Sequence, residues 1–147
     1  MQYKNVAIEA KFTLGLAKAS TASTAEAKKL CLEAVNLAKE GGDSALLSRA
    51  MLALAETMLE TDDARTALEL ATQAQARFAT AGQQESEWRA WLIAARASQL
   101  LGDKTNAPEQ LANGKKVYAQ LQQNWGTEVF NRYLTRPDIQ VYYKQLG

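Results

Sequence analysis

Three stretches of this 147-residue chain repeat the same pattern at offsets of forty residues. They read EAKFTLGLAKASTAS at 9–23, RAMLALAETMLETDD at 49–63 and RAWLIAARASQLLGD at 89–103. A second helical run follows each stretch, with apolar residues spaced three and four apart. A fixed period of this length is typical of proteins built from repeated helical hairpins. The repeat therefore predicts an all-α fold and favours a binding scaffold.

The composition agrees with a helical chain that stays in solution. Apolar residues make up 47% of the sequence, much of it alanine, and there are only two prolines. The 17 basic and 16 acidic residues leave a net charge of +1, which gives no reason to expect nucleic acid or an anionic membrane as partner. The N-terminal segment MQYKNVAIEAKF carries charges where a signal peptide needs an apolar region, and the single Cys31 cannot form an internal disulfide. We therefore expect a cytoplasmic protein.

Helix start and stop signals divide the chain into one domain, 1–147, with three repeats and a tail. The repeats cover about 3–42, 43–82 and 83–126, and the tail at 127–147 is expected to cap the array with two short helices. Glycines at 41–42, 82 and 102 should end helices. The expected N-terminal caps are the Ser23–Glu26 box, Asp43, Asp62 or Asp63, and the Asn106–Glu109 box.

The apolar spacing also predicts which faces are buried. In the first helix, about 3–18, the inner stripe should consist of Val6, Ala10, Leu14 and Ala17. In the tail, Phe130, Tyr133, Leu134 and Ile139 should cover the last hairpin. Small residues recur at forty-residue offsets, at Gly15, Ala55 and Ala95 and at Ala34, Ala74 and Gly114, where paired helices would cross closely. The alternative is an irregular bundle in which the many alanines align by chance.

With these positions aligned, the chain resembles the tetratricopeptide (TPR) family over about residues 7–120. The third unit carries the resemblance best, with Trp91, Ala95, Gly102-Asp103, Ala107, Leu111 and Gly114 at the family's pattern positions. Its period of forty instead of 34 residues and the missing proline between units depart from the family. The resemblance implies a right-handed α-solenoid of three antiparallel hairpins. The tail also resembles segments that close such arrays in large bacterial regulatory proteins.

The residue types that usually act in catalysis or metal binding are either absent from the sequence or expected to have a structural role. The chain has no histidine, which removes the commonest general base and the commonest neutral metal ligand. Cys31 falls on an inner helix position and is expected to be a buried structural thiol. The sequence thus predicts no catalytic residue, cofactor or metal, and so no enzyme. Trp88, Trp91, Trp125 and Tyr142-Tyr143 could stack on a ligand, but packing is the simpler role.

The resemblance to TPR arrays places a peptide-binding groove on the first helix of each hairpin. The expected groove residues are Phe12, Arg49, Leu52, Glu56, Arg89, Ile93, Arg96 and Gln99. Arginines suit carboxylate recognition and the apolar residues suit a peptide, so a protein or peptide partner is expected. Two alternatives remain open: the arginines pair with nearby glutamates on a solvated surface, or the chain is an oligomerisation domain that forms a homodimer through its groove or tail.

Overall fold

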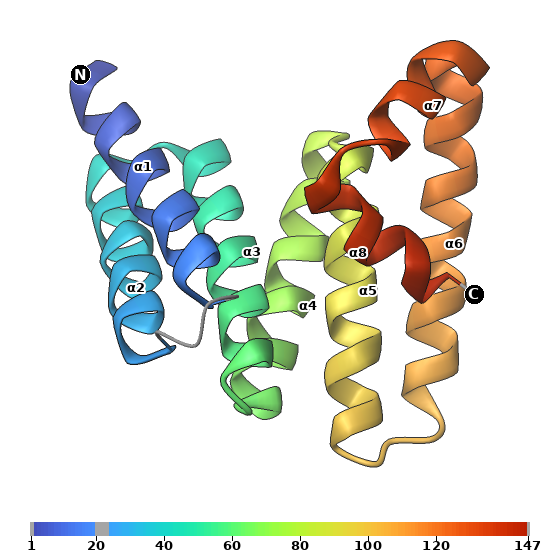
Figure 1. Cartoon of the computed structure of the whole chain (residues 1–147), viewed down its shortest axis with the longest axis horizontal. Coiled ribbons are helices and arrows are strands. Elements are labelled where there is room, and N and C mark those ends of the chain that lie inside the picture. Colours follow the sequence, from blue (N-terminus) through green and yellow to red (C-terminus); the bar gives the residue numbers. More distant parts are fainter. Residues whose placement is uncertain (1, 20–23, 147) are drawn as a thin grey trace.

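The computed structural model describes the backbone of residues 2–19 and 24–146, and the side chains from residue 4 onward within these ranges. This part of the chain is entirely helical, with no strand. Figure 1 shows the helices in order from the N-terminus to the C-terminus. Their bounds are α1 Gln2–Ala19, α2 Thr24–Gly41, α3 Ser44–Glu60, α4 Ala64–Ala81, α5 Gln84–Leu100, α6 Asn106–Trp125, α7 Thr127–Leu134 and α8 Pro137–Gln145.

The first six helices form three consecutive antiparallel pairs, α1–α2, α3–α4 and α5–α6 (Figure 1). Each pair also contacts the next one, through α2–α3 and α4–α5, and the first helices of successive pairs touch through α1–α3 and α3–α5. Within the described residues no Cα atom of α2 lies within 8 Å of a Cα atom of α4 or α6. Most neighbours are therefore sequential or one hairpin apart, and the buried residues of α1 to α8 form one hydrophobic core.

The ends of the helices follow the predicted signals in most places. Asp43 and Asp63 each cap a helix by accepting a backbone N–H three residues on, at 3.0 Å from Leu46 and 3.2 Å from Thr66. Gly82 adopts the left-handed conformation, with φ of 71°, directly after α4. Ser23 of the predicted Ser23–Glu26 box lies outside the described residues.

The predicted Asn106–Glu109 capping box is wrong. Asp103 performs the capping instead, because its carboxylate accepts the backbone N–H groups of Thr105 at 3.2 Å and Asn106 at 2.9 Å. These hydrogen bonds lower the pKa of Asp103. The aspartate sits in the loop directly before α6, where its short side chain reaches the free N–H groups of the first turn.

The predicted inner stripe of α1 is also wrong. Val6 and Leu14 are 65% and 50% exposed, and Ala10 and Ala17 are exposed as well. The buried face of α1 consists instead of Ile8, Phe12, Gly15 and Ala19. Both stripes satisfy helical periodicity, and the spacing alone does not say which one faces a neighbour.

Gly15 lies where α1 and α2 approach most closely. A Cβ atom built on Gly15 would lie 2.5 Å from Cys31 Sγ and 3.2 Å from the carbonyl oxygen of Ala27. The Cys31 side chain fills this space and is fully buried, with Thr57 Oγ1 3.4 Å from its sulfur. Burial raises the pKa of the Cys31 thiol, which fits the predicted structural role. Forty residues on, Ala55 and Ala71 occupy the equivalent positions and are both fully buried.

We expect Gly15→Ala to destabilise the protein, even though alanine favours a helix by about 1 kcal/mol over glycine. Overpacking against Cys31 Sγ should cost about 1–3 kcal/mol. The double variant Gly15→Ala/Cys31→Ala reproduces the Ala55–Ala71 pair, so it should be more stable than the two single variants predict by addition. Chemical denaturation of the four proteins measures this coupling, and strictly additive effects would contradict a direct contact.

Candidate functional site

A network of polar side chains begins at the first turns of α5. Glu85 and Arg89 are four residues apart and so face each other on one side of the helix. Arg89 Nη2 donates to Glu85 Oε2 at 2.9 Å, and Arg89 Nε donates to the backbone carbonyl of Glu85 at 3.2 Å. The Arg89 side chain is only 18% exposed. A partly buried arginine of this kind needs paired acceptors, and Glu85 supplies them.

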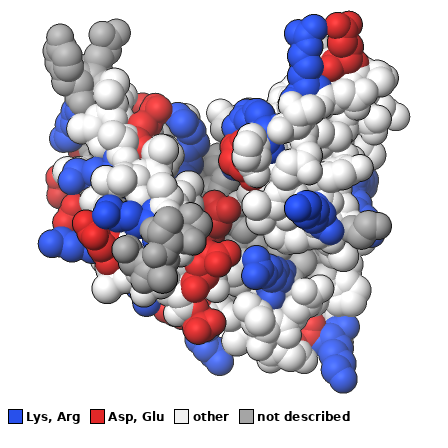
Figure 2. All heavy atoms as spheres, in the orientation of Figure 1, with Lys and Arg blue, Asp and Glu red and all other residues white. Residues whose placement is uncertain are grey.

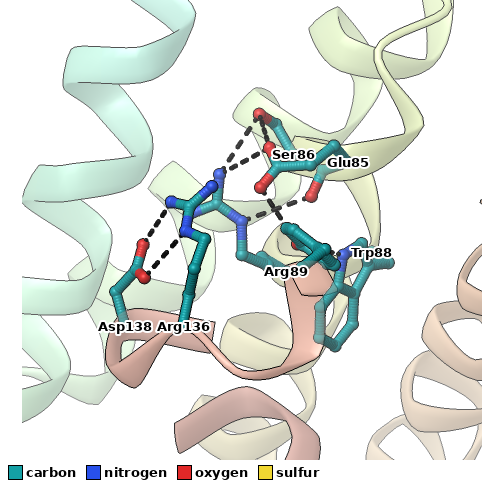
Figure 3. A network of polar contacts seen from close by, with 7 residues as sticks. Glu85, Ser86, Trp88, Arg89, Arg136 and Asp138 are labelled. Carbon is teal, nitrogen blue, oxygen red and sulfur yellow. Dashed lines mark hydrogen bonds and ion pairs between the residues drawn. The ribbon is translucent and has the colours of Figure 1, made fainter. Parts of the chain in front are cut away.

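The network extends from α5 into the tail (Figure 3). Tyr133 of α7 donates its hydroxyl hydrogen to Glu85 Oε1 at 2.9 Å, and the Tyr133 hydroxyl oxygen accepts the Trp88 Nε1–H at 3.0 Å. Trp88 is fully buried, so this hydroxyl satisfies an indole N–H that water does not reach. Packing is thus the role of Trp88. A single chain of hydrogen bonds links Arg89, Glu85, Tyr133 and Trp88 and attaches α7 to α5.

Helix α8 completes the site. Its Tyr142 ring lies 5.8 Å from the Arg89 guanidinium carbon and 5.9 Å from the Trp88 ring. Just before α8, Arg136 forms a two-pronged ion pair with Asp138, at 3.1 and 2.6 Å, and its guanidinium lies over the Tyr133 ring. Figure 3 shows the Arg136–Asp138 pair beside Arg89. As predicted, the tail packs on the last hairpin: Phe130, Tyr133 and Ile139 are buried, and Leu134 is partly buried.

The site holds several groups whose pKa values differ from the ordinary ones. Burial raises the pKa of the Glu56 carboxyl of α3, and the Tyr142 hydroxyl and the Arg89 guanidinium only partly oppose this. Burial also raises the pKa of Tyr142 well above its usual value, helped by the charge of Glu56. Burial acts to lower the pKa of Arg89, but the charge of Glu85 outweighs it and the net shift is upward. Tyr142 Oη is thus close enough to the Glu56 carboxyl to affect its pKa, but the two groups do not meet the geometry of a hydrogen bond, and Tyr142 Oη has no other partner within the described residues.

The predicted groove residues lie in two different situations. Phe12, Leu52 and Ile93 are 7%, 5% and 2% exposed, so they belong to the core and offer a ligand little surface. Glu56 and Arg89 are partly buried near Tyr142. Arg49, Arg96 and Gln99 are exposed. Peptide binding by this set stays a prediction, but the structure shows that only the last three present an open surface.

Both exposed arginines join neighbouring helices. Arg49 Nη1 lies 3.1 Å from Glu9 Oε1 of α1, and its guanidinium lies 5.5 Å from the centre of the Phe12 ring. Arg96 Nη1 lies 3.7 Å from Glu60 Oε1 of α3. The side chains of these pairs are between 42% and 46% exposed. Figure 2 shows that this surface is hollowed between the N-terminal and the C-terminal helices and carries charges of both signs.

A small pocket continues this surface at the far end of α8. It has a volume of about 220 Å³ and is lined by Leu92, Ala95, Arg96, Gln99, Leu111 and Gln145. Gln99 also lines an adjoining pocket at the start of α6, together with Asp103 and Leu111. Sequence reasoning missed that α8 lies along this side of α5. The only available signal was the adjacent tyrosines 142 and 143, and only the first of the two is buried.

No further chemistry emerges from the described residues. They contain no group of three or more Cys, Asp or Glu side chains that could hold a metal ion, and the sequence has no histidine. In the described ranges no helix is both long enough and apolar enough to cross a membrane. Comparison with known proteins finds no matching family model, no matching curated protein and no matching solved structure.

We expect Tyr133→Phe to destabilise the protein by about 1–3 kcal/mol, because the buried Trp88 N–H loses its acceptor and Glu85 loses a donor. Tyr143→Phe is the matched control, since Tyr143 is 44% exposed and should tolerate the loss of its hydroxyl. Urea denaturation of both variants measures the difference. Equal stability of the two variants would contradict the proposed link between α7 and α5.

Glu56 should make stability fall as the pH rises. Its pKa in the folded protein lies above the ordinary value of 4.5, so the folded state holds the proton more tightly than the unfolded state. Stability is therefore lost as the pH rises through the raised pKa. Glu56→Gln should be more stable than the wild type near pH 7, and the gain should vanish below pH 4.5.

The measurement is the difference in unfolding free energy between Glu56→Gln and the wild type, followed from pH 4 to pH 8. Taking this difference removes the contribution of the other carboxylates. Glu69→Gln, at an exposed position of α4, is the control and should show no such trend. A Glu56→Gln variant that is less stable than the wild type at neutral pH would show that the ionised carboxylate is a favourable part of the site.

Proposed function

We propose that this chain is a TPR-like, right-handed array of three hairpins with a C-terminal cap, and that it acts as a scaffold for a protein or peptide partner. The partner would bind the face formed by α1, α3 and α5. The forty-residue repeat and the sequential contacts of these three helices support this arrangement. The lack of histidine and of metal-binding clusters among the described residues fits a binding role better than an enzymatic one.

The observation that carries the proposal is that this face already receives a helix. Ile139 and Tyr142 of α8 are 0% and 2% exposed, and Arg89 lies within reach of the Tyr142 ring. The charge of Arg89 also helps to lower the pKa of Asp138, after the larger effect of Arg136. The face thus accepts a short helix with an apolar residue, an aromatic anchor and a carboxylate. A partner segment of the same chemistry suits the remaining open part.

The part of this face that α8 does not cover carries two ion pairs whose glutamates a partner can replace. The Arg49–Glu9 and Arg96–Glu60 pairs are exposed, and exposed ion pairs contribute only about 0–1 kcal/mol to stability. A carboxylate of a partner can therefore replace either glutamate at little cost. The two glutamates also discourage a purely acidic ligand, so a peptide of mixed charge is preferred. Because the face is short, we expect micromolar affinity.

The test is to select binding peptides from a library of short helical sequences and then to measure them against Arg49→Ala/Arg96→Ala. We expect the double variant to bind at least roughly tenfold more weakly, which corresponds to about 1.4 kcal/mol. Arg132→Ala is the matched control, because Arg132 also pairs with a glutamate but lies on α7 with its side chain 77% exposed. Peptides that bind both variants equally well would place the binding site elsewhere.

A further inference from the structure

A pocket lies between the first two hairpins, where α2, α3 and α4 meet. It has a volume of about 410 Å³, within the range of about 300–1,000 Å³ that is common for small-molecule sites. Its apolar wall consists of Val35, Leu47, Met51 and Leu70. None of these side chains is among the residues expected in the peptide-binding groove, so the pocket is not part of that groove.

The other side of the pocket carries positive charge. Two cations line it, Lys39 of α2 and Arg77 of α4, and no acidic residue does. Within the described residues neither cation forms an ion pair with a carboxylate. An apolar wall beside two cations that lack an acidic partner is complementary to a ligand with an apolar body and a negative charge.

Hydrogen bonds to the first turn of α3 hold the Arg77 guanidinium in place. Its Nε donates to Ser48 Oγ at 2.7 Å, and its Nη2 donates to the carbonyl oxygen and to the Oγ of Ser44, at 3.1 and 3.0 Å. Nη1 has no acceptor within the described residues, so its N–H groups can bind an anion. A guanidinium that is already oriented loses less conformational freedom when it binds a carboxylate.

The junction between the second and third hairpins shows what the repeat places at the equivalent position. A pocket of about 280 Å³ lies there. At an offset of forty residues, its lining residues Glu87, Trp91, Asn113, Lys116 and Val117 correspond to Leu47, Met51, Gln73, Ala76 and Arg77 of the first pocket.

This second pocket contains an aromatic ring and a carboxylate that belong to the chain. Trp91 Nε1 donates to Glu87 Oε2 at 3.3 Å, and Gln75 Nε2 donates to the same oxygen at 3.1 Å. Lys116 lines the pocket as well. Ring, carboxylate and cation are thus present together at the second junction.

The first junction differs from the second in a coordinated way. It has Leu47 and Met51 in place of the acid and the ring, and its pocket is larger. It also has two cations, Lys39 and Arg77, where the second junction has Ala79 and Val117. The first pocket therefore has the cations and the room, but neither the ring nor the carboxylate.

We propose that the first pocket binds a small aromatic carboxylate. The ring lies against Leu47 and Met51, and the carboxylate accepts hydrogen bonds from Arg77 Nη1 with the charge of Lys39 nearby. Such a ligand supplies from outside the two groups that Trp91 and Glu87 supply at the second junction. This site is independent of partner binding to the face of α1, α3 and α5.

The first test is isothermal titration calorimetry of the full chain with indole-3-propionate, which joins the ring of a tryptophan to a carboxylate. We expect saturable one-to-one binding with a Kd below about 1 mM. Indole alone and propionate alone should each bind at least roughly tenfold more weakly, because each lacks one of the two recognised groups. The absence of saturable binding, or indole that binds as tightly as the acid, overturns the proposal.

The second test locates the probe with two variants of α4. Arg77→Met should weaken binding at least roughly tenfold, because it removes a charge-assisted hydrogen bond, and Arg65→Met at an exposed position of α4 is its control. Ala76→Phe keeps both cations but fills the pocket, so it should abolish binding. Ala79→Phe, the same change at an exposed position outside the pocket, should not. Circular dichroism checks that all four variants stay helical.

Binding that survives either Arg77→Met or Ala76→Phe would place the probe elsewhere and overturn the proposal. A short peptide that ends in tryptophan presents the same ring and carboxylate from a protein source. It should bind at least roughly tenfold more weakly than indole-3-propionate, because its amide groups lose water without gaining partners in an apolar pocket. Tighter binding of the peptide would assign the pocket to a protein terminus and overturn the small-molecule site.

Discussion

The close approach of helices at small residues is the constraint on which this structure depends. At the crossing of α1 and α2, the missing side chain of Gly15 leaves room for Cys31 Sγ. At the crossing of α5 and α6, a Cβ on Gly114 would lie 3.2 Å from side-chain atoms of both Trp91 and Leu92. Alanines fill the equivalent positions elsewhere and are almost fully buried.

Alanine buries little area, so this mode of packing has an energetic consequence. Stabilisation by burial scales with the apolar area removed from water, and a single alanine contributes little of it. The contribution comes instead from the many contacts that backbones and short side chains make when the helices lie close together. A few large residues supply the rest, and Phe78 and Trp88 are the largest that are fully buried. One added methyl group at a crossing therefore disturbs much of the local packing.

The C-terminal end uses a different principle, in which polar groups are buried but satisfied. Arg89 would be costly in a partly buried position without Glu85, and Glu85 in turn accepts the hydroxyl of Tyr133. Each member compensates the burial of the next, so the tail and α5 depend on each other. The exception is Tyr142, whose hydroxyl makes no hydrogen bond within the described residues, close to a Glu56 carboxyl with a raised pKa. Burial raises the pKa values of both Glu56 and Tyr142 at that point, between α3, α5 and α8.

Much of the fold could be predicted from the sequence because it depends on local signals. Asp43, Asp63 and Gly82 act within one helical turn, and the repeat fixes which helices pair. The burial of α1 could not be predicted in this way. Both of its stripes have helical spacing, and only the contacts of α1 with α2 and α3 decide which stripe is buried. The repeat identifies equivalent positions, but it does not say which of them a neighbouring helix covers.

The candidate site shows the same limit. The forty-residue repeat predicts Arg49, Arg89 and Arg96 on one face. The tail lies outside the repeat, so the repeat cannot predict that α8 packs on α5. Tyr142 and Asp138 approach Arg89 only through three-dimensional packing. The pairing of Arg49 with Glu9 and of Arg96 with Glu60 was anticipated as the alternative to ligand binding. Ion pairing within the chain and binding of a ligand are compatible, since an exposed ion pair is weak and a ligand carboxylate can replace the glutamate.

The two ends of the array differ because the faces they leave open differ in size. Without the tail, the last hairpin would expose Trp88 and Tyr118, and large aromatic surfaces of this kind cause irreversible association. A cover that belongs to the same chain prevents this at every concentration. The first hairpin leaves a few smaller apolar residues exposed, among them Val6, Leu14 and Leu32, a surface small enough to tolerate in water. Burying one larger apolar side chain contributes about 1.5–3 kcal/mol. The cover over Trp88 and Tyr118 therefore stabilises the last hairpin more than a cover over Val6 and Leu14 would stabilise the first.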